Sequence, residues 1–437
     1  MNRNPIYNLK AVLKDTGLKP DVLRAWERRY GLPNPERTEG GHRLYSEYDV
    51  AMLKWLIKRQ GEGLSISHAV KKLQEELSSG LDPLNVNSVS SYENPNAAFE
   101  NQGENSLDAL RNSWIKACFS YNEVQAEGYL NQAFALYSVE TVCLKVLQQG
   151  IAEVGYSWLA GEATVQQEHY ASAMALRRLN SLMLATPAPN RPHTILIGCP
   201  SDEWHAFTPL LIALFLRRKG FNVIYLGPNV PSNRFKETID QIKPSLVILS
   251  AQQLTSAAAL HKLSLVLQEC NASVCYGGRI FNIQPSLREY IAGQFLGESI
   301  EIALANVERL VSSAHTIFIH RRPSEEQVDT LEHFLKNRHR IDAIISVNIR
   351  SVSQISYENL DIANRFMGDN LVASLELGSL SYLYSEIEWL RVLLKNQKLP
   401  ENIIPDYFRM YSSAVDETMR EHGDIIRHWI ETQVLNQ

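Results

Sequence analysis

The 437-residue sequence has few cysteines and no long apolar run. The first feature argues against disulfide-rich and zinc-binding proteins, and the second argues against membrane-spanning ones. Its five cysteines are scattered without a C-x-x-C pair, which argues against a disulfide framework or a zinc site. Cys199 and Cys275 lie in apolar runs and are expected to be buried. No apolar stretch reaches the roughly 18 residues of a membrane span, and residues 1–10 contain no apolar signal-peptide core. We therefore expect a soluble, cytoplasmic protein with no membrane partner.

The composition is that of a globular protein with several domains. Hydrophobic residues make up 45% and charged residues 21%, which excludes wholesale disorder. At roughly 100–200 residues per domain, the length predicts two to four domains. The net charge of −5 hides an asymmetry, because residues 1–80 carry a net +4 and the remainder −9. A basic head on an acidic body indicates that contact with nucleic acid is confined to the N-terminal head.

Changes in composition divide the chain after the head, residues 1–78. Residues 79–105 are rich in Ser, Asn, Gly and Pro, as in a flexible linker. Residues 106–188 have apolar residues at helical spacing, enough for about four helices in a bundle. Residues 189–313 alternate short β-rich runs with amphipathic segments, which predicts a parallel sheet flanked by helices. The predicted strands are Ile195–Cys199, Val223–Leu226, Leu246–Ser250, Ser273–Tyr276 and Gln294–Leu296.

The C-terminal extension, residues 314–437, is predicted to be mostly helical, with Ala343–Val347 as a candidate strand. Its aromatic residues fall at roughly helical spacing, which is more typical of a core than of a ligand pocket. A second sensor and an oligomerisation surface are alternative roles. The residues by themselves assign it no function.

The head has the spacing of a helix-turn-helix. Helices are predicted at Leu9–Thr16 and Pro20–Tyr30, and Pro20 suits the first turn of a helix. Arg24, Arg28 and Arg29 share one face of the second helix, where guanidinium groups can contact phosphates or guanine edges. A solvated charged face is the alternative interpretation.

A hairpin or wing is predicted after the second helix. The segment from Arg37 to Tyr45 places Gly40-Gly41 between two polar arms. Ser46 then caps the next helix, with Asp49 three residues further on.

The run from Arg24 to Leu32, then Pro35, Arg37 and Gly41 to Tyr45, resembles the winged-helix head of MerR-type regulators over about residues 6–76. In that family the recognition helix and the wing bind operator DNA as a dimer. The resemblance implies six DNA contacts: Arg24, Arg28, Arg37, His42, Arg43 and Tyr45. Trp26 and Tyr30 could equally be core aromatics. Because the linker offers no long dimerisation helix, we expect oligomerisation through the later domains.

The loop after the first predicted strand contains Glu203-x-His205. Open α/β sheets bind ligands at this edge, and a carboxylate beside a histidine is a recurrent metal arrangement because it fixes the imidazole tautomer. A structural histidine is the alternative.

With Ser250 after the third strand and Gly277-Gly278 after the fourth, the pattern resembles the cobalamin-binding domain of corrinoid enzymes and sensors. The resemblance implies that His205, beside Glu203, is the lower axial cobalt ligand. The dimethylbenzimidazole tail would enter a slot past Ser250, Gly277 and Gly278. Two positions depart from the pattern: Thr208-Pro209 replaces a glycine, and Gln252 replaces a leucine. Both are expected to face the slot.

A capping box at Thr164 and Gln167 places Glu168 and His169 near Trp158 across a tight turn, although ordinary packing would give the same residues. Their spacing resembles the bundle of adenosylcobalamin-dependent, light-sensing repressors of the CarH/LitR type. The resemblance implies that Trp158, Glu168 and His169 contact the upper axial adenosyl group. Leu159 departs from it, because those light sensors have a histidine there that can ligate cobalt.

The predicted fold is multidomain, α and α/β: a winged helix-turn-helix head, a four-helix bundle, a Rossmann-like cobalamin-binding domain and a mostly helical extension. The leading hypothesis is a light-responsive transcriptional regulator, a repressor rather than an enzyme. It would bind adenosylcobalamin and operator DNA and form a homotetramer, and photolysis of the Co–C bond would change its oligomeric state and DNA binding. A light-independent corrinoid sensor is the alternative that Leu159 favours. A corrinoid-carrying methyltransferase or mutase subunit is a third, which the head argues against.

Overall fold

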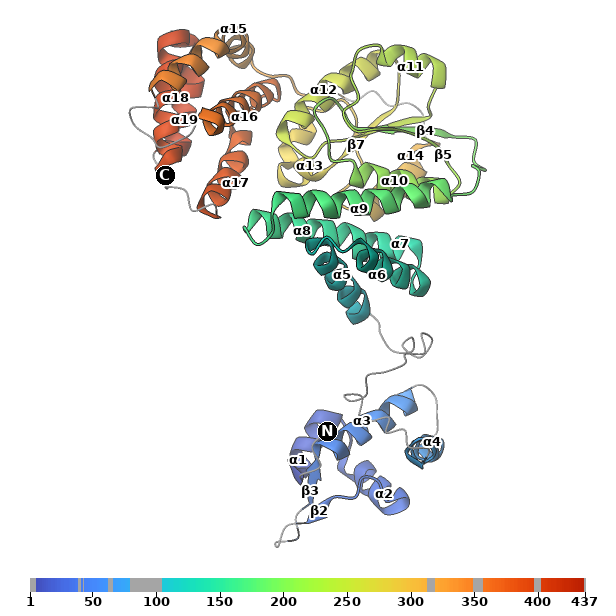
Figure 1. Cartoon of the computed structure of the whole chain (residues 1–437). Coiled ribbons are helices and arrows are strands. Elements are labelled where there is room, and N and C mark those ends of the chain that lie inside the picture. Colours follow the sequence, from blue (N-terminus) through green and yellow to red (C-terminus); the bar gives the residue numbers. More distant parts are fainter. Residues whose placement is uncertain are drawn as a thin grey trace. The chain divides into compact units, whose positions relative to one another are not determined.

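The computed structural model describes residues 5–37, 41, 43–61, 66–78, 104–312, 319–348, 357–396 and 402–435. The chain divides into two compact units, Met1–Ala98 and Phe99–Gln437, whose secondary structure is drawn in Figure 1. The predicted linker, residues 79–105, lies outside the described residues except for its last two, which begin α5.

The first unit is a helix-turn-helix with a three-stranded antiparallel sheet in the order β1-β3-β2. Both predicted helices are confirmed, and a left-handed glycine, Gly17 or Gly31, ends each one and donates its amide to the carbonyl four residues earlier. The predicted Ser46–Asp49 cap is also present, with the Ser46 amide 2.8 Å from Asp49 Oδ2. The elements of this unit are β1 (Pro5–Asn8), α1 (Leu9–Thr16), α2 (Pro20–Tyr30), β2 (Glu36–Arg37), β3 (Arg43–Ser46), α3 (Glu47–Gly61) and α4 (Ile66–Ser78).

The second unit begins with the predicted bundle, in which α7, a π-helical segment η1 and α8 run on as one helix. Gly150 lets this helix approach α5 closely, because a Cβ there would lie 2.8 Å from the ring of the buried Trp114. The bundle elements are α5 (Glu104–Phe119), α6 (Glu123–Leu136), α7 (Val139–Val142), η1 (Cys143–Gln148), α8 (Gln149–Leu159) and α9 (Val165–Leu184).

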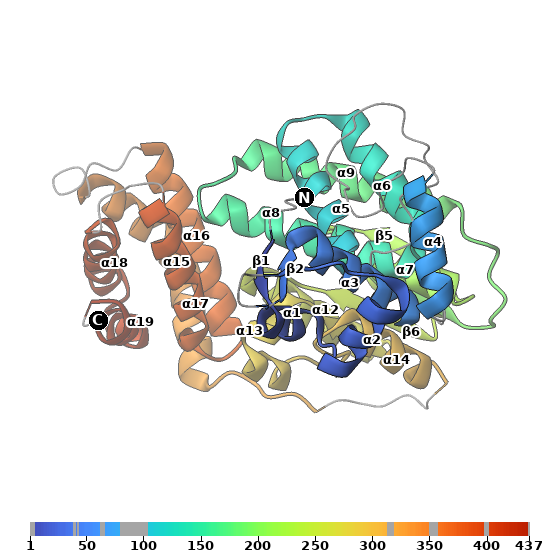
Figure 2. The same ribbon diagram turned by 90° about the horizontal axis from the view of Figure 1, so that it is seen from below.

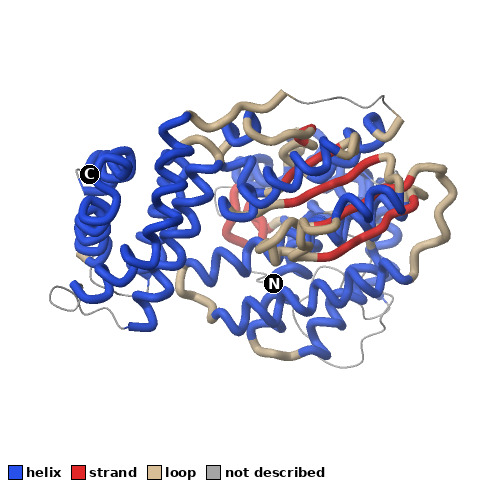
Figure 3. Tube along the Cα trace, turned by 90° about the horizontal axis from the view of Figure 1, so that it is seen from above, coloured by secondary structure: helices blue, strands red, loops and turns tan. Residues whose placement is uncertain are grey.

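The bundle is followed by a sheet of five parallel strands in the order β5-β4-β6-β7-β8, seen in red in Figure 3. All five predicted strands are present. The strands are β4 (Thr194–Gly198), β5 (Asn222–Gly227), β6 (Leu246–Ser250), β7 (Val274–Gly277) and β8 (Gln294–Phe295). The helices between and after them are α10 (Phe207–Arg218), α11 (Phe235–Ile242), α12 (Leu254–Glu269), α13 (Arg279–Ile283), η2 (Pro285–Glu289) and α14 (Ile300–Leu310).

The sheet separates two apolar cores, because successive side chains of a strand point to opposite faces. In β6, Leu246 and Ile248 belong to a core shared with the bundle. Val247 and Leu249 belong to a second core, shared with α12 and the C-terminal extension. The sheet domain is therefore covered by the bundle on one face and joined to the extension on the other.

The extension is helical, as predicted, and Figures 1 and 2 show it beside the sheet domain, where α16 contacts α12. Its elements are α15 (Glu325–Asn348), α16 (Tyr357–Glu376), η4 (Leu380–Tyr382), α17 (Leu383–Asn396), α18 (Ile403–Met419), η5 (Arg420–Gly423), α19 (Asp424–Ile430) and η6 (Glu431–Leu435). The candidate strand Ala343–Val347 is wrong, because it lies inside α15. The buried side chains of that helix recur at helical spacing: Thr330, Phe334, Ile341 and Ile345.

Four of the five cysteines are buried, as expected for Cys199 and Cys275, and burial raises the pKa of each of these two thiols to about 12. Such thiols pack as small apolar side chains. Among the described helices, none combines the length and the apolar character that crossing a membrane requires.

Candidate functional site

The loop between β4 and α10 carries the predicted histidine and its carboxylate. Glu203 is fully buried, and its Oε1 lies 2.6 Å from Nδ1 of His205 and accepts the His205 amide at 2.9 Å. The His205 side chain is 57% exposed. Because an ionised carboxylate only accepts hydrogen bonds, Nδ1 carries the proton and Nε2 presents its lone pair. That is the arrangement of a histidine prepared to ligate a metal.

The other oxygen of Glu203 is also bound by the protein. Oε2 accepts a hydrogen bond from Ser256 Oγ at 2.7 Å and one from the Gln252 amide at 2.5 Å. Burial alone would raise the pKa of Glu203, but the hydrogen bonds from His205 and Ser256 outweigh it and hold the pKa below its usual value. The hydrogen bond to Glu203 in turn raises the pKa of His205. The two side chains are therefore linked by a short hydrogen bond.

A cavity of about 200 Å³ opens at the carboxyl ends of β6 and β7. Ser250 and Gly277 are paired there in register, and both line it together with Gly278. A Cβ on Gly277 would meet no atom within 4 Å, so this backbone is open to the cavity. Gly278 has φ +124°, and a Cβ there would lie 1.9 Å from the carbonyl oxygen of Ala251. Only glycine suits that position.

The two departures from the family pattern, Thr208-Pro209 and Gln252, line the same cavity, as the sequence predicted. The Gln252 amide spans it: Nε2 donates to Ser250 Oγ at 3.2 Å, and Oε1 accepts the Arg279 amide at 2.9 Å. A flat ligand that passes Ser250 must therefore displace the Gln252 side chain.

The predicted capping box at the start of α9 is confirmed, since Thr164 and Gln167 exchange both hydrogen bonds. Glu168, in the first turn, accepts from Ser172 Oγ at 2.7 Å and is near enough to His205 to raise its pKa. His169 is exposed on the same helix. The charge of Glu168 in the bundle therefore acts on His205 of the sheet domain.

Trp158 and Leu159, at the end of α8, meet a partner that sequence reasoning missed. The Trp158 ring lies 6.2 Å from that of Trp389 in the extension, and Asn396 Nδ2 donates to the Leu159 carbonyl at 2.6 Å. No local motif marks Trp389, because an apolar position at helical spacing looks the same whichever element it packs against. The partner of the Asn396 amide is likewise set by the tertiary fold and not by neighbouring residues.

In the head, Arg24 and Arg28 are exposed on α2. Arg43 Nε lies 2.9 Å from Glu27 Oε2. The placement of Tyr45 among the DNA contacts is wrong for this structure, because Tyr45 is fully buried and its hydroxyl donates to Glu27 Oε1 at 2.6 Å. Trp26 is also a core aromatic. The backbone of Arg37 lies in β2, whereas its side chain and the whole of His42 lie outside the described residues.

Comparisons with known proteins match three segments of the chain. Residues 7–76 match the MerR HTH family of regulatory proteins. Residues 110–182 and residues 193–305 match two families, each described as a B12 binding domain. The matched segments correspond to the head, the bundle and the sheet domain, and they end before the extension.

Curated relatives are similar over the same parts. The HTH-type transcriptional repressor CarH of Myxococcus xanthus is 32% identical over 252 residues, which cover 57% of this chain and 80% of CarH. The HTH-type transcriptional repressor CarA of the same organism is 29% identical over 264 residues, covering 60% and 81%. Among solved structures, the monomethylamine corrinoid protein of Methanosarcina barkeri aligns with a TM-score of 0.41 at 18% identity, covering 48% of this chain and all of that protein.

Proposed function

The chain belongs to the MerR-type, cobalamin-binding transcriptional repressors, and from that premise we propose that it is an adenosylcobalamin-dependent, light-responsive repressor. The observation that carries the proposal is the pairing of His205 with the buried Glu203, beside the cavity at Ser250 and Gly277. In the same chain, the head supplies exposed arginines on its second helix.

The residues at the strand ends fit the lower face of a cobalamin. His205 presents Nε2 as a ligand, and Glu203 fixes its tautomer and increases its basicity. The Ser250 hydroxyl and the bare backbone of Gly277 line the cavity that would receive the tail. When bound, adenosylcobalamin supplies a cobalt–carbon bond that visible light breaks.

On the opposite face, Glu168 and Trp158 would hold the adenosyl group between the bundle and the sheet domain. If light removed that group, Glu168 and Trp158 would lose their contacts with it, and the bundle would be free to shift against the sheet. The shift changes the oligomeric state, for which we propose a tetramer in the dark. Several linked heads then bind one operator with an avidity that single heads lack. The net charge of −9 outside the head repels DNA, so binding is confined to the heads.

Leu159 favours a second candidate function, a corrinoid sensor that does not respond to light. An aliphatic side chain cannot ligate cobalt, so Leu159 cannot replace a lost upper ligand. His169 is exposed on α9 and is the nearest histidine in sequence that could do so. A change of absorption on illumination without a change of oligomeric state would favour this second function.

Replacement of His205 tests the cofactor assignment. Three proteins are incubated with adenosylcobalamin in darkness and desalted: the wild-type full chain, His205→Ala and His428→Ala. His428 is an exposed histidine on α19 and serves as the control. We expect wild type and His428→Ala to retain the cofactor with an imidazole-coordinated spectrum. His205→Ala should retain less and show a spectrum without imidazole coordination. An unaltered spectrum in His205→Ala would refute the ligand assignment.

A further inference from the structure

Helix α17 of the extension packs against the end of α8, where the proposed upper face lies. The Trp389 and Trp158 rings are 6.2 Å apart, and Trp389 also stacks on Phe366 of α16 at 6.1 Å. The Asn396 side chain donates to the Leu159 carbonyl at 2.6 Å. The last carbonyls of a helix have no partner within it, so Asn396 caps α8 from a distant part of the sequence.

The same helix is fixed to the other side of the proposed site. Gln284, which follows α13, donates through Nε2 to Ser385 Oγ at 2.6 Å and to the Tyr382 carbonyl at 2.9 Å. Arg279, which lines the cavity, is near enough to Glu386 of α17 to oppose the rise that burial causes in the pKa of that carboxyl. The beginning of α17 thus contacts the sheet domain, and its end contacts the bundle.

We propose that α17 is a positioning element of the cobalamin site, which holds Trp158 and the end of α8 in the arrangement that contacts the cofactor's upper face. The inference rests on the proposed function. It gives the extension, which the matched families do not cover, a role in sensing. Because coupling between two sites is reciprocal, α17 favours cofactor binding and the bound cofactor stabilises the docked helix.

Three variants of the full chain separate this role from simple folding. Trp389→Ala removes the ring contact, and Asn396→Ala removes the cap on α8. Tyr384→Ala is the matched control, because Tyr384 lies on the same helix and is 45% exposed. Dissociation of adenosylcobalamin in darkness is followed by absorption, and thermal unfolding of the cofactor-free proteins checks the fold.

Trp389→Ala and Asn396→Ala should each release cobalamin at least fivefold faster than wild type, at the lower end of ordinary coupling between sites, while Tyr384→Ala matches wild type. Hydrogen exchange of residues 383–396 in wild type should slow when cofactor is added. Unchanged release in both variants, with unchanged exchange, would overturn the role of α17. If wild type retains no cobalamin, the proposed function itself fails. If Trp389→Ala does not fold, Asn396→Ala and the exchange measurement decide.

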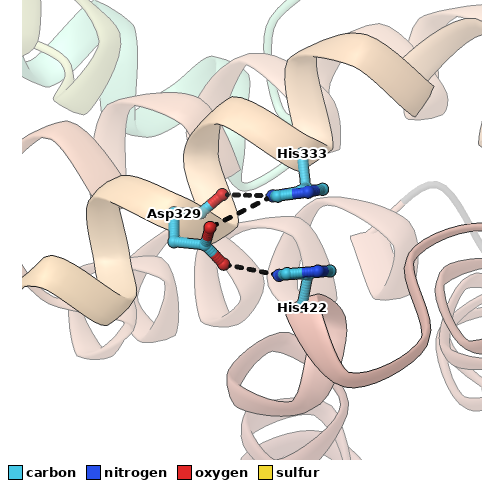
Figure 4. A group of neighbouring side chains, drawn as sticks. All are labelled: Asp329, His333 and His422. Atoms are coloured by element: carbon cyan, nitrogen blue, oxygen red, sulfur yellow. Dashed lines mark hydrogen bonds and ion pairs between the residues drawn. The ribbon is translucent and has the colours of Figure 1, made fainter.

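A separate group of side chains in the extension has the donor set of a transition-metal site (Figure 4). Asp329 and His333 lie one turn apart on α15, and His422 reaches them from η5. Oδ2 of Asp329 is 2.6 Å from His422 Nδ1, and Oδ1 is 3.4 Å from His333 Nδ1. The two imidazoles are stacked with centroids 3.6 Å apart, so both Nδ1 atoms lie on the same carboxylate.

Two imidazoles and one carboxylate are ligands for borderline divalent ions such as Zn²⁺, Fe²⁺ and Ni²⁺. One donor atom from each residue lies within 4.8 Å of the others, and all three side chains are partly exposed, so an ion can enter. His333 Nδ1 also lies 3.0 Å from the Asp329 carbonyl oxygen, so a bound ion must displace that contact.

We infer that Asp329, His333 and His422 bind a divalent transition-metal ion that fastens η5 to α15. The cobalamin-free full chain is treated with a chelator and titrated with Zn²⁺ by calorimetry, alongside His333→Ala, His422→Ala and the control His428→Ala. Wild type and His428→Ala should bind one more Zn²⁺ per chain than the other two variants, and zinc should raise the thermal midpoint only where that site is intact. Equal stoichiometry in all four proteins, or no binding to wild type, would mean that the three residues only hydrogen-bond to one another.

Discussion

Glu203 sets the state of His205, because the buried carboxylate contacts both the ring and the amide of that residue. Glu203→Gln keeps the shape of the side chain but removes the charge that favours one tautomer. The change should weaken cobalamin binding through His205 by roughly 10- to 100-fold, the usual effect of losing such a partner. Ser256→Ala, which removes one hydrogen bond to the same carboxylate, should have a smaller effect. Equilibrium titration with cobalamin measures both, and equal affinity of Glu203→Gln and wild type would contradict the account.

In the head, replacement of Arg28 should change DNA binding, whereas replacement of Tyr45 should change stability. Arg28→Ala removes an exposed cation from α2, so the slope of log affinity for DNA against log salt should fall by about one. Tyr45→Phe removes a hydrogen bond to the Glu27 carboxylate, so it should cost the head about 1.5–3 kcal/mol of stability and leave the salt slope unchanged. Binding titrations at several salt concentrations and denaturant unfolding separate the two. A reduced salt slope in Tyr45→Phe would restore it as a DNA contact.

Gly277 and Gly278, at the end of β7, are expected to tolerate a side chain differently. Gly277→Val should still fold, since its Cβ would meet no atom within 4 Å, but its side chain would enter the cavity and reduce cobalamin retention by roughly tenfold, the cost of overpacking. Gly278→Ala should instead lower the stability of the cofactor-free protein by more than the roughly 1–3 kcal/mol of backbone strain, because its Cβ would also lie 1.9 Å from the carbonyl oxygen of Ala251. Thermal unfolding and cobalamin titration of both variants test this, and normal cobalamin binding by Gly277→Val would show that the tail lies elsewhere.

Elements with local signals could be predicted from the sequence, and elements fixed by distant contacts could not. The helix at 20–30 has Pro20 at its start and Gly31 just after its end, so local residues determine where it begins and ends. The run around Ile344 and Ile345 has the β-branched residues of a strand, yet burial of Ile341 and Ile345 on one face makes it helical. Glu203 and His205 are two residues apart, so the sequence alone predicted that they form a pair.

The contact between α17 and α8, in contrast, could not be predicted from the sequence. Trp389 and Trp158 meet only because the extension folds back beside the bundle, and no spacing in either segment encodes that contact. Tyr45 was misplaced for a related reason. Its position in the wing suited a DNA contact, but the partner that buries its hydroxyl, Glu27, comes from α2.

At the scale of the whole molecule, the sheet depends on a partner at each face. Leu260, Leu263 and Leu267 of α12 share a core with Leu371 of α16 and Phe408 of α18. Removing residues 313–437 would therefore expose this apolar surface, which is unfavourable in water. The shortened chain should unfold at a temperature lower by several degrees and bind an apolar dye more strongly than the full chain. An unchanged midpoint without dye binding would mean that the sheet domain is stable without the extension.

If cobalamin binds between the bundle and the sheet domain, as we propose, and the heads bind DNA, a change at the cofactor can reach the DNA through a change of oligomeric state. The most direct test records absorption and elution volume together. The full chain is mixed with adenosylcobalamin in darkness, desalted, and measured before and after illumination with visible light. We predict retained cofactor whose spectrum changes on illumination, together with a shift to a smaller oligomer. Loss of the cofactor on desalting would contradict the account. An oligomeric state that changes neither with cofactor nor with light would contradict it as well.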